Sequence, residues 1–319
     1  MILCITLNPC LDKTLTVPAW RPGDSVRGTA VREVVGGKGN NVARALSRLG
    51  RPARPVTFLG GLVGERCATL LRDDDGLDPW LTTTVAPTRV ILTVRTEGSA
   101  EQSAFFDPDP SIDPAEAEAL FQRIDAALSV GGVEALTLSG SSPAPATHRL
   151  YADLIALGQA REVPVFLDTY GPALAGIEGF WPTVIQLNRR EAGIYLQRPS
   201  PDESDLRLLL ESWSRLGVSC VVVTDGPASA LVRLLGRDYR VQPPRVEVVN
   251  PIGSGDCLLA GLTDGWLSGL GPEALIRHSF GCAVSNALVW DAGAVDPAMV
   301  ATQGRAVVIE ALDREFRGS

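Results

Sequence analysis

The sequence predicts an α/β fold in which one doubly wound, mostly parallel sheet is covered by helices on both faces. Short runs of valine, isoleucine and leucine alternate with amphipathic helical segments from residue 113 onward, which is typical of a parallel sheet with both faces buried. Two stretches, at 11–35 and 88–106, instead alternate apolar and polar residues and predict a separate half-exposed sheet. The 319 residues, of which 45 % are hydrophobic, can build a core of this size.

The composition indicates which classes of partner are disfavoured and in which compartment the protein is expected. The formal net charge is −8 and no long basic run occurs, which argues against nucleic acid or an anionic membrane as a partner. The six cysteines are scattered without a C-x-x-C pair, so we expect buried free thiols in a reducing compartment. The N-terminus lacks the features of a signal peptide, and no apolar run approaches the ~18 residues of a membrane span. We therefore expect a cytoplasmic protein.

The N-terminal part combines core strands with one helix. Residues 2–7 are almost entirely apolar and predict a buried strand. A glycine-rich stretch at 36–41 precedes apolar residues at helical spacing, which predict a helix that ends near Gly50. Residues 56–59 predict a second core strand that is closed by two glycines.

Four half-polar segments interrupt this pattern and predict a second, smaller sheet. They cover residues 11–17, 27–35, 88–96 and 102–106. We expect them, within about 11–36 and 86–107, to form a lid over the site in a single domain of residues 1–319. One face of such a sheet can meet substrate, and the other is apolar and must be hidden. We therefore expect a homodimer in which two lids pack together.

The rest of the chain alternates regularly between helices and strands. Helices are predicted at 115–128, 146–160 and 203–216, and strands at 135–139, 165–168, 184–187, 220–224 and 245–249. In parallel sheets of this kind, ligands bind beyond the carboxyl ends of the strands. The polar residues that we expect to gather at this edge are Ser139, Asp168, Asn188, Thr224 and Asp256.

The stretch Gly253-Ser254-Gly255-Asp256 lies before a predicted helix at 257–267. Its two glycines let successive backbone N–H groups converge, and the helix N-terminus adds free N–H groups and a positive dipole end. We expect Asp256 at or near the N-cap. A carboxylate beside such an anion hole suits a general base that takes a hydroxyl proton while the N–H groups hold a phosphoryl group. An ordinary turn and N-cap is the alternative interpretation of this stretch alone.

The stretch 36–41, Gly-Gly-Lys-Gly-Asn-Asn, places flexible backbone, one cation and two amides before a helix. Together with the later stretch, about 215 residues on, it resembles the ribokinase-type sugar kinases, the PfkB carbohydrate kinase family. The resemblance also includes the segments 6–9, 139–141, 188–191 and 281–287. The opening Thr-Leu-Asn-Pro-x-x-Asp is most similar to the 1-phosphofructokinase and tagatose-6-phosphate kinase branch.

The resemblance implies a ribokinase-like three-layer fold and transfer of the γ-phosphate of ATP to a hydroxyl of fructose-1-phosphate, tagatose-6-phosphate or fructose-6-phosphate. It implies Mg²⁺ as cofactor and leaves a monovalent cation open. The catalytic group would be Asp256, beside Gly253, Ser254 and Gly255. Substrate contacts would come from Asp12, Gly37, Lys38, Asn41 and Ser139. Nucleotide contacts would come from Asn188, Thr224, Gly226, Gly255 and Asn286, and Asn188 and Glu191 would hold Mg²⁺ through water.

Two arginines indicate an acceptor that already carries a phosphate. Arg27 and Arg89 are long cations on the predicted lid strands, and a guanidinium can bind phosphate through two hydrogen bonds. We expect them to converge with Lys38 on that phosphate. The alternative is that both arginines are simply solvated. Asn188 and Glu191 also have an alternative interpretation, as the capping box of a helix.

Three departures from the branch leave the sugar phosphate open. Gln186 stands where the branch has lysine, Ser229 replaces the second glycine of the nucleotide loop, and Asp107 and Asp109 lie in the lid segment near the sugar. The alternative functions are a kinase of an unphosphorylated sugar, inositol or nucleoside, and a non-catalytic sugar-binding regulator. A serine hydrolase is disfavoured, because no G-x-S-x-G motif occurs and only two histidines are present.

Overall fold

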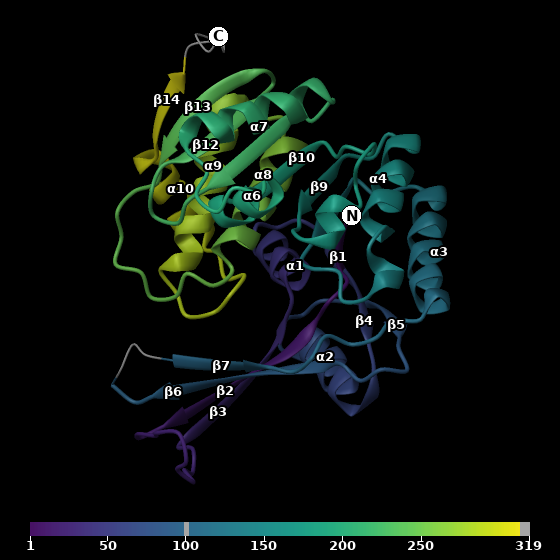
Figure 1. Cartoon of the computed structure of the whole chain (residues 1–319), viewed down its shortest axis with the longest axis vertical. Coiled ribbons are helices and arrows are strands. Elements are labelled where there is room, and N and C mark those ends of the chain that lie inside the picture. Colours follow the sequence, from purple (N-terminus) through teal and green to yellow (C-terminus); the bar gives the residue numbers. More distant parts are fainter. Residues whose placement is uncertain (99–101, 313–319) are drawn as a thin grey trace.

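The computed structural model of the chain describes residues 1–98 and 102–312. Its centre is a ten-stranded sheet in the order β14-β13-β12-β11-β10-β9-β8-β1-β4-β5 (Figure 1). The strands are β1 Ile2–Thr6, β4 Ala53–Leu59, β5 Trp80–Thr83, β8 Ala135–Ser139, β9 Val165–Asp168, β10 Val184–Asn188, β11 Cys220–Thr224, β12 Ala230–Leu234, β13 Arg237–Gln242 and β14 Val308–Leu312. The pairs from β11 to β5 are parallel and those from β11 to β14 antiparallel, so the predicted fold class is confirmed.

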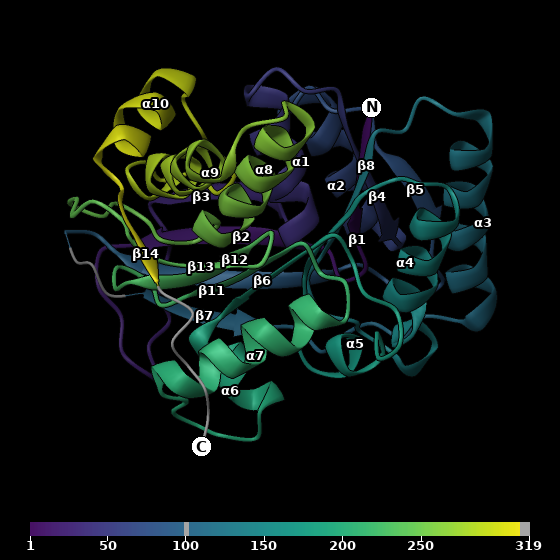
Figure 2. The same ribbon diagram turned by 90° about the horizontal axis from the view of Figure 1, so that it is seen from above.

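Helices cover both faces of this sheet, which gives three layers (Figure 2). One face carries α1 Lys38–Arg48, α2 Gly61–Asp73, α8 Ser254–Leu267, α9 Pro272–Ala287 and α10 Pro297–Ala306. The other carries α3 Pro114–Val130, the short η1 Pro145–Thr147, α4 Leu150–Ala160, α5 Pro172–Ala175, α6 Arg189–Tyr195 and α7 Glu203–Arg215. Because successive side chains of a strand point to opposite faces, Ile2 and Cys4 of β1 join one apolar core, whereas Leu3 and Ile5 join the other. In the part of the chain that the structure describes, no helix is long and apolar enough to cross a membrane.

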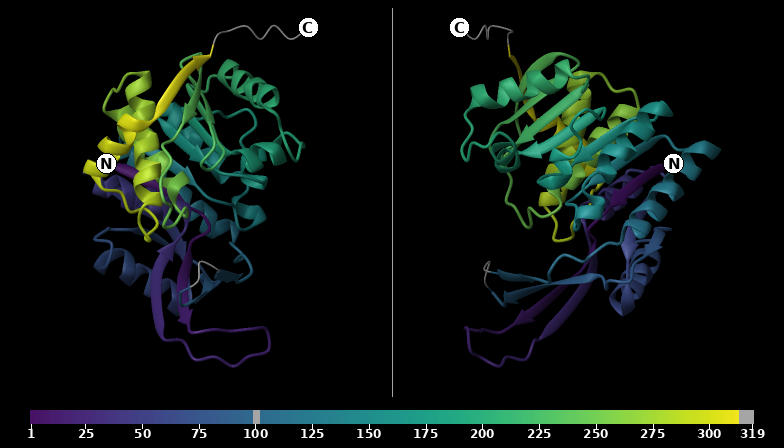
Figure 3. Two further views of the ribbon diagram at one scale, coloured as in Figure 1. Left: turned by 90° about the vertical axis from the view of Figure 1, so that its left-hand side faces the viewer. Right: turned by 45° about the vertical axis from the view of Figure 1, so that its right-hand side comes forward.

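A separate four-stranded sheet, the lid sheet, projects from the body in the order β3-β2-β6-β7 (Figure 3). Its strands are β2 Cys10–Val17, β3 Ala30–Gly36, β6 Arg89–Thr96 and β7 Gln102–Phe106. The prediction of a second sheet from these two parts of the chain is confirmed. Several apolar side chains of this sheet are exposed, among them Val31, Phe105 and Phe106.

Two arginines of the lid sheet contact the loop that follows α9. The guanidinium of Arg95 lies 4.4 Å from the centre of the Trp290 ring, which is a cation–π contact. Arg32 forms an ion pair of 2.5 Å with the Asp291 carboxylate. The lid sheet is therefore attached to the body at two ends, through its own chain connections and through this loop.

Some predicted boundaries were wrong. Residues 245–249 form no strand, because Pro243 and Pro244 interrupt the ladder after β13 and the following valines stay half exposed. Helix α8 begins at Ser254, three residues before the predicted start, and Asp256 lies in its first turn, near the N-cap Gly253. Arg27 precedes β3 and lies in an exposed loop, not on a strand.

Candidate functional site

The polar residues that end the parallel strands meet at one edge of the sheet, as the sequence predicts. Ser139 at the end of β8 is the register partner of Asp168 at the end of β9. Asp168 is also opposite Gln186 of β10, and Asn188 is opposite Thr224 of β11. Parallel pairing therefore brings side chains that are far apart in the sequence to the edge where ligands bind in such sheets.

At this edge Lys38 joins three carboxylates into what we call the carboxylate cluster: Lys38, Asp168, Glu191 and Asp256. The Lys38 Nζ atom lies 2.8 Å from Asp168 Oδ1 and 3.6 Å from Glu191 Oε1. Burial lowers the pKa of Lys38, but the three carboxylates outweigh it and hold this pKa above its ordinary value. The ammonium group therefore stays charged at neutral pH and partly neutralises the cluster.

Asp256 is a deeply buried carboxylate of the cluster, with 5 % of its surface exposed. Burial raises its pKa to about 7; Lys38 opposes this, Asp168 and Glu191 reinforce it, and a hydrogen bond from Asn41 opposes it. Asn41 Nδ2 donates that bond to Asp256 Oδ2 over 2.7 Å. A carboxylate with a pKa near neutrality is well suited to accept a proton from a hydroxyl group.

The amide of Asn41 is held in one orientation by Arg44, a residue that the sequence analysis missed. Arg44 Nη1 donates to Asn41 Oδ1 over 2.7 Å, so the NH₂ end of the amide faces Asp256. Arg44 is almost fully buried, and its other bonds are to the Val35 carbonyl and the Asp75 carboxylate. An arginine on the apolar face of a helix is rarely buried without such partners, and this pattern could have drawn attention to it.

The turn before α8 has the backbone geometry that the predicted anion site requires. Gly253 has φ +86°, and a Cβ atom there would lie 2.9 Å from the Cβ of Ala292, so only glycine fits without strain. Asn286 braces the turn, since its Nδ2 donates to the Ile252 carbonyl over 2.8 Å and its Oδ1 accepts from Gly293 N. Asn286 is fully buried in this role. No side chain caps the first turn of α8, which contains Asp256, and an uncapped helix N-terminus of this kind can bind an anion.

Gln186, which replaces a lysine of the family branch, is also part of this arrangement. Its Nε2 donates to the Gly255 carbonyl over 2.8 Å and lies 3.5 Å from Asp168 Oδ2. A neutral amide thus connects the α8 turn with the cluster. Of the two lysines of the chain, Lys38 pairs with carboxylates of this cluster, whereas Lys13 pairs with Glu33.

The residues expected to contact the nucleotide and the metal differ in their contacts: some take part in a helix cap, and others lie at the end of a strand or in a turn. Asn188 Oδ1 accepts from Glu191 N and Glu191 Oε2 accepts from Asn188 N, so the two form the capping box of α6. Glu191 still directs Oε1 toward Lys38, and burial is the main reason why its pKa is raised. Thr224 ends β11, and Gly226 follows in a turn with φ +56°.

A divalent cation is compatible with the cluster, although the protein supplies no complete cage. Within residues 1–98 and 102–312, no group of three or more histidine, cysteine, aspartate or glutamate side chains is arranged to hold a metal ion. Mg²⁺ prefers oxygen ligands and usually takes one or two carboxylates together with phosphates and water. The carboxylates of Asp168 and Glu191 offer such a partial set.

Several residues that were expected to contact the sugar lie where the lid sheet joins the body, a region that we call the sugar end. Gly37 adopts φ +110° and lies against Thr6, and Asp12 of β2 is nearby on the lid side. The pKa of Asp12 is raised by burial, and the charges of Arg44 and Arg89 oppose that shift. Arg89 Nη2 donates to the Asn8 carbonyl over 3.3 Å, and Arg89 Nη1 lies 3.2 Å from Asp109 Oδ1.

Arg27, Lys38 and Arg89 have different surroundings in this structure. Arg27 lies in the exposed loop before β3, and the ion-pair partners of Lys38 are Asp168 and Glu191. Ser139 is fully buried, and its Oγ is among the described side-chain atoms without a hydrogen-bond partner. Of these three cations, Arg89 is the one that contacts the junction of the lid sheet and the body, and convergence of all three on a phosphate stays a prediction.

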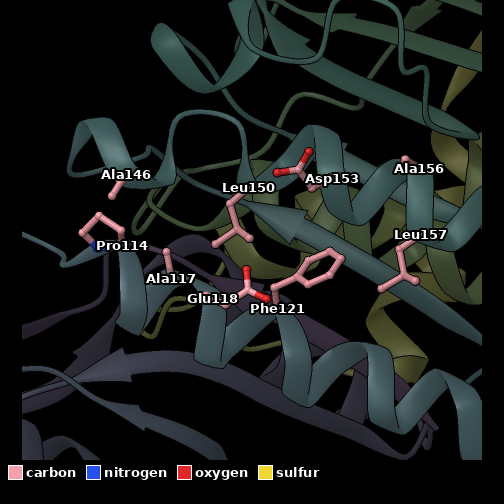
Figure 4. A pocket seen from close by; sticks show the side chains of 9 residues that line it. All are labelled: Pro114, Ala117, Glu118, Phe121, Ala146, Leu150, Asp153, Ala156 and Leu157. Atoms are coloured by element: carbon pink, nitrogen blue, oxygen red, sulfur yellow. The ribbon is translucent and has the colours of Figure 1, made fainter.

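A groove of about 460 Å³ lies elsewhere, between helices α3 and α4 (Figure 4). Phe121, Leu150 and Leu157 contribute apolar surface, and Glu118 and Asp153 are its two carboxylates. These side chains belong to the outer helix layer and none of them ends a strand of the sheet. The groove is therefore distinct from the carboxylate cluster.

Comparison with known proteins agrees with this arrangement. The family model for the pfkB family carbohydrate kinases matches residues 4–300. Phosphofructokinase-2 of Escherichia coli in its tetrameric inhibited form is 26 % identical, with a TM-score of 0.86 over 96 % of this chain and 98 % of that chain. The same enzyme in complex with fructose-6-phosphate is 25 % identical, with a TM-score of 0.82 over the same shares. A possible 1-phosphofructokinase of Thermotoga maritima shares the fold, at 21 % identity and a TM-score of 0.86 over 98 % of this chain and 99 % of that chain.

Proposed function

The chain belongs to the pfkB family of carbohydrate kinases, and on that premise we propose that it transfers the γ-phosphate of ATP to a hydroxyl of a phosphorylated ketohexose. The observation that carries this proposal is Asp256, a buried carboxylate with a pKa of about 7 in the first turn of a helix with free N–H groups. Fructose-1-phosphate, tagatose-6-phosphate and fructose-6-phosphate are the candidate acceptors.

In the proposed reaction Asp256 takes the proton of the acceptor hydroxyl while the hydroxyl oxygen forms a bond to the γ-phosphorus. The bond between that phosphorus and the bridging oxygen of ADP breaks, and ADP leaves. Asn41, held by Arg44, fixes the orientation of the Asp256 carboxylate. The N–H groups of the α8 turn hold the oxygens of the transferred group, where negative charge accumulates.

Lys38 and the remaining carboxylates prepare the phosphate end of the site. Lys38 keeps a positive charge between Asp168 and Glu191, from where an ammonium group can neutralise a phosphate oxygen. Mg²⁺ held by these carboxylates would supply further positive charge to the nucleotide phosphates. A monovalent cation stays a prediction. The resemblance implies sugar contacts for Lys38, whereas its observed contacts favour a role at the transferred phosphate.

Arg89 is the group that would recognise a phosphate already present on the acceptor. It lies at the junction of the lid sheet and the body, and its side chain is 15 % exposed. The complex of the Escherichia coli relative with fructose-6-phosphate supports an acceptor of this kind. Removal of Arg89 should therefore affect a sugar phosphate more than the corresponding free sugar.

A kinase of an unphosphorylated sugar is the second candidate, and one observation favours it. The Asp109 carboxylate neutralises the charge of Arg89, and neither Arg27 nor Lys38 adds a cation at that position. An acceptor without a phosphate would need no further cation there.

We also propose that the protein forms a homodimer through the lid sheet. The strand registers place Val31 and Phe105 on one face of the lid sheet, their exposed fractions are 58 % and 53 %, and an apolar sheet face is stabilised when it is packed against a partner. Packing of two lid sheets would cover these side chains. The tetrameric form of the Escherichia coli relative shows that a member of this family can self-associate.

A panel of paired acceptors tests the proposed function. ADP release is measured with fructose, fructose-1-phosphate, fructose-6-phosphate, tagatose and tagatose-6-phosphate, each with the wild type, Asp256→Asn and Arg89→Ala. We expect a phosphorylated ketohexose to give the highest kcat/KM, loss of several orders of magnitude in turnover for Asp256→Asn, and a KM increase for Arg89→Ala that is confined to phosphorylated acceptors. A higher kcat/KM for a free sugar than for its phosphate, together with no effect of Arg89→Ala, refutes the sugar-phosphate assignment.

A further inference from the structure

The sugar end of the site contains a carboxylate that the proposed reaction does not use. Asp109 Oδ1 lies 3.2 Å from Arg89 Nη1 and accepts a hydrogen bond of 2.8 Å from Asn8 Nδ2. The same Asn8 nitrogen also lies 3.0 Å from Ser141 Oγ. Donors from two distant parts of the chain, Asn8 and Arg89, thus hold one anionic group.

This set of donors and acceptors is incomplete. Arg89 Nε and Asn8 Oδ1 are buried and belong to the described side-chain atoms without a hydrogen-bond partner. A buried polar group left without a partner costs free energy, so such groups commonly mark the place of a ligand or water. A phosphate oxygen would accept from Arg89 Nε, and a sugar hydroxyl would donate to Asn8 Oδ1. A sugar phosphate offers both.

The two neighbouring carboxylates of this segment have different functions. Asp107 Oδ2 accepts from Val90 N over 2.8 Å, and Asp107 N donates to the Val90 carbonyl over 3.0 Å, so Asp107 fastens the segment to β6. Asp109 makes its contacts with side chains instead, and 49 % of its side chain is exposed compared with 15 % for Arg89. Asp109 can therefore move away while Asp107 and Arg89 stay in place.

On the basis of the proposed function, we propose that Asp109 is a specificity-determining residue whose carboxylate competes with the acceptor's phosphate for Arg89 and Asn8. A phosphate oxygen on Arg89 Nε and the Asp109 carboxylate on Nη1 would place two anions on one guanidinium, with strong repulsion between them. A phosphorylated acceptor must displace Asp109 to bind, whereas an unphosphorylated acceptor leaves the pair intact. Asp109 thus sets how strongly the site prefers phosphorylated over free sugars, through a repulsive element directed at one class of acceptor.

The test measures phosphate affinity without requiring turnover. Binding of inorganic phosphate is followed by isothermal titration calorimetry for the wild type, Asp109→Asn, Asp109→Ala and Asp107→Asn. The Asp107→Asn variant changes the net charge by the same amount two residues away and keeps an oxygen that can accept from Val90 N. We expect at least about tenfold tighter phosphate binding for both Asp109 variants and less than about twofold change for Asp107→Asn.

The kinetic readout separates this proposal from the proposed function. The comparison uses a sugar phosphate and the corresponding free sugar, both of which the enzyme accepts as substrates. Asp109→Asn should lower the KM of the sugar phosphate and leave the KM of the free sugar within about twofold. Unchanged or weaker phosphate binding in the Asp109 variants, or equal tightening in Asp107→Asn, overturns the role of Asp109. Absence of any sugar-phosphate kinase activity, together with tighter phosphate binding by Asp109→Asn, instead refutes the acceptor class and leaves the competition for Arg89 standing.

Discussion

Replacement of Asp256 by asparagine should make the folded protein more stable while it abolishes turnover. The carboxylate is 5 % exposed and its pKa is raised from 3.8 to about 7, so the folded state tolerates its charge poorly. A shift of this size corresponds to roughly 4 kcal/mol between the charged and neutral forms. For a chain of 319 residues that energy corresponds to an increase in Tm of roughly 6 °C.

The pH dependence gives this prediction its sign. The pKa of Asp256 is higher in the folded than in the unfolded chain, so the ionised group destabilises the fold, and this cost grows as pH rises from about 4 to about 7. Below pH 4 both states bind the proton and the cost vanishes. The stability difference between Asp256→Asn and the wild type should therefore increase across this interval and stay constant above it.

Asp264 on the same helix provides a control of opposite sign. Burial alone would raise its pKa, but His278 and Arg51, with contacts of 2.7 Å each, hold it below the ordinary value. Its charge therefore stabilises the fold above the pKa of the unfolded chain, and Asp264→Asn should lower the free energy of unfolding at pH 7. Chemical denaturation of both variants and the wild type between pH 4 and 8 makes the comparison. Equal destabilisation by both substitutions at pH 7.5 would refute the argument that the charge of Asp256 is strained.

Three further predictions follow from the same cluster and from the lid sheet. The acid limb of kcat/KM should have a midpoint near pH 7, because Asp256 must be ionised to accept a proton, and a flat profile from pH 5.5 to 7.5 would contradict this. Lys38→Met should move that limb to higher pH, since the ammonium group lowers the pKa of Asp256; an unchanged midpoint in a folded variant would exclude the coupling. Phe105→Glu should convert a dimer into a monomer of 33.8 kDa in light scattering at micromolar concentration, and a wild type that is itself monomeric would rule out the lid-sheet dimer.

The arrangement of strands was predictable because hydrophobic runs and their end residues are local features of the sequence. Ser139, Asp168, Asn188 and Thr224 could be assigned to one sheet edge from the position of each at the end of an apolar run. The strand predicted at 245–249 was wrong because alternating valines also occur in exposed segments. The local pattern does not show whether a neighbouring strand is present to pair with the segment.

The contacts within the site were less accessible to sequence reasoning. Lys38 meets Asp168 and Glu191 across 130 and 153 residues, and which carboxylate a lysine selects depends on packing that no spacing reveals. The role of Asn188 and Glu191 was ambiguous because their spacing fits both a capping box and a metal site. The structure shows the capping hydrogen bonds. Arg89 and Asp109 were both noticed, but their pairing was visible only in three dimensions.

The stacking of Arg95 on Trp290 gives the protein an internal optical probe. Indole emission depends on nearby charge and water, and this ring has a lid-sheet cation 4.4 Å from its centre while it belongs to the body. Any displacement of the lid sheet must change the surroundings of this one fluorophore. Of the six tryptophans, Trp290 can be isolated by comparison with Trp290→Phe, so lid movement becomes a stopped-flow signal that needs no attached dye. The rate of that movement can then be compared directly with turnover, which would show whether chemistry or opening limits the cycle.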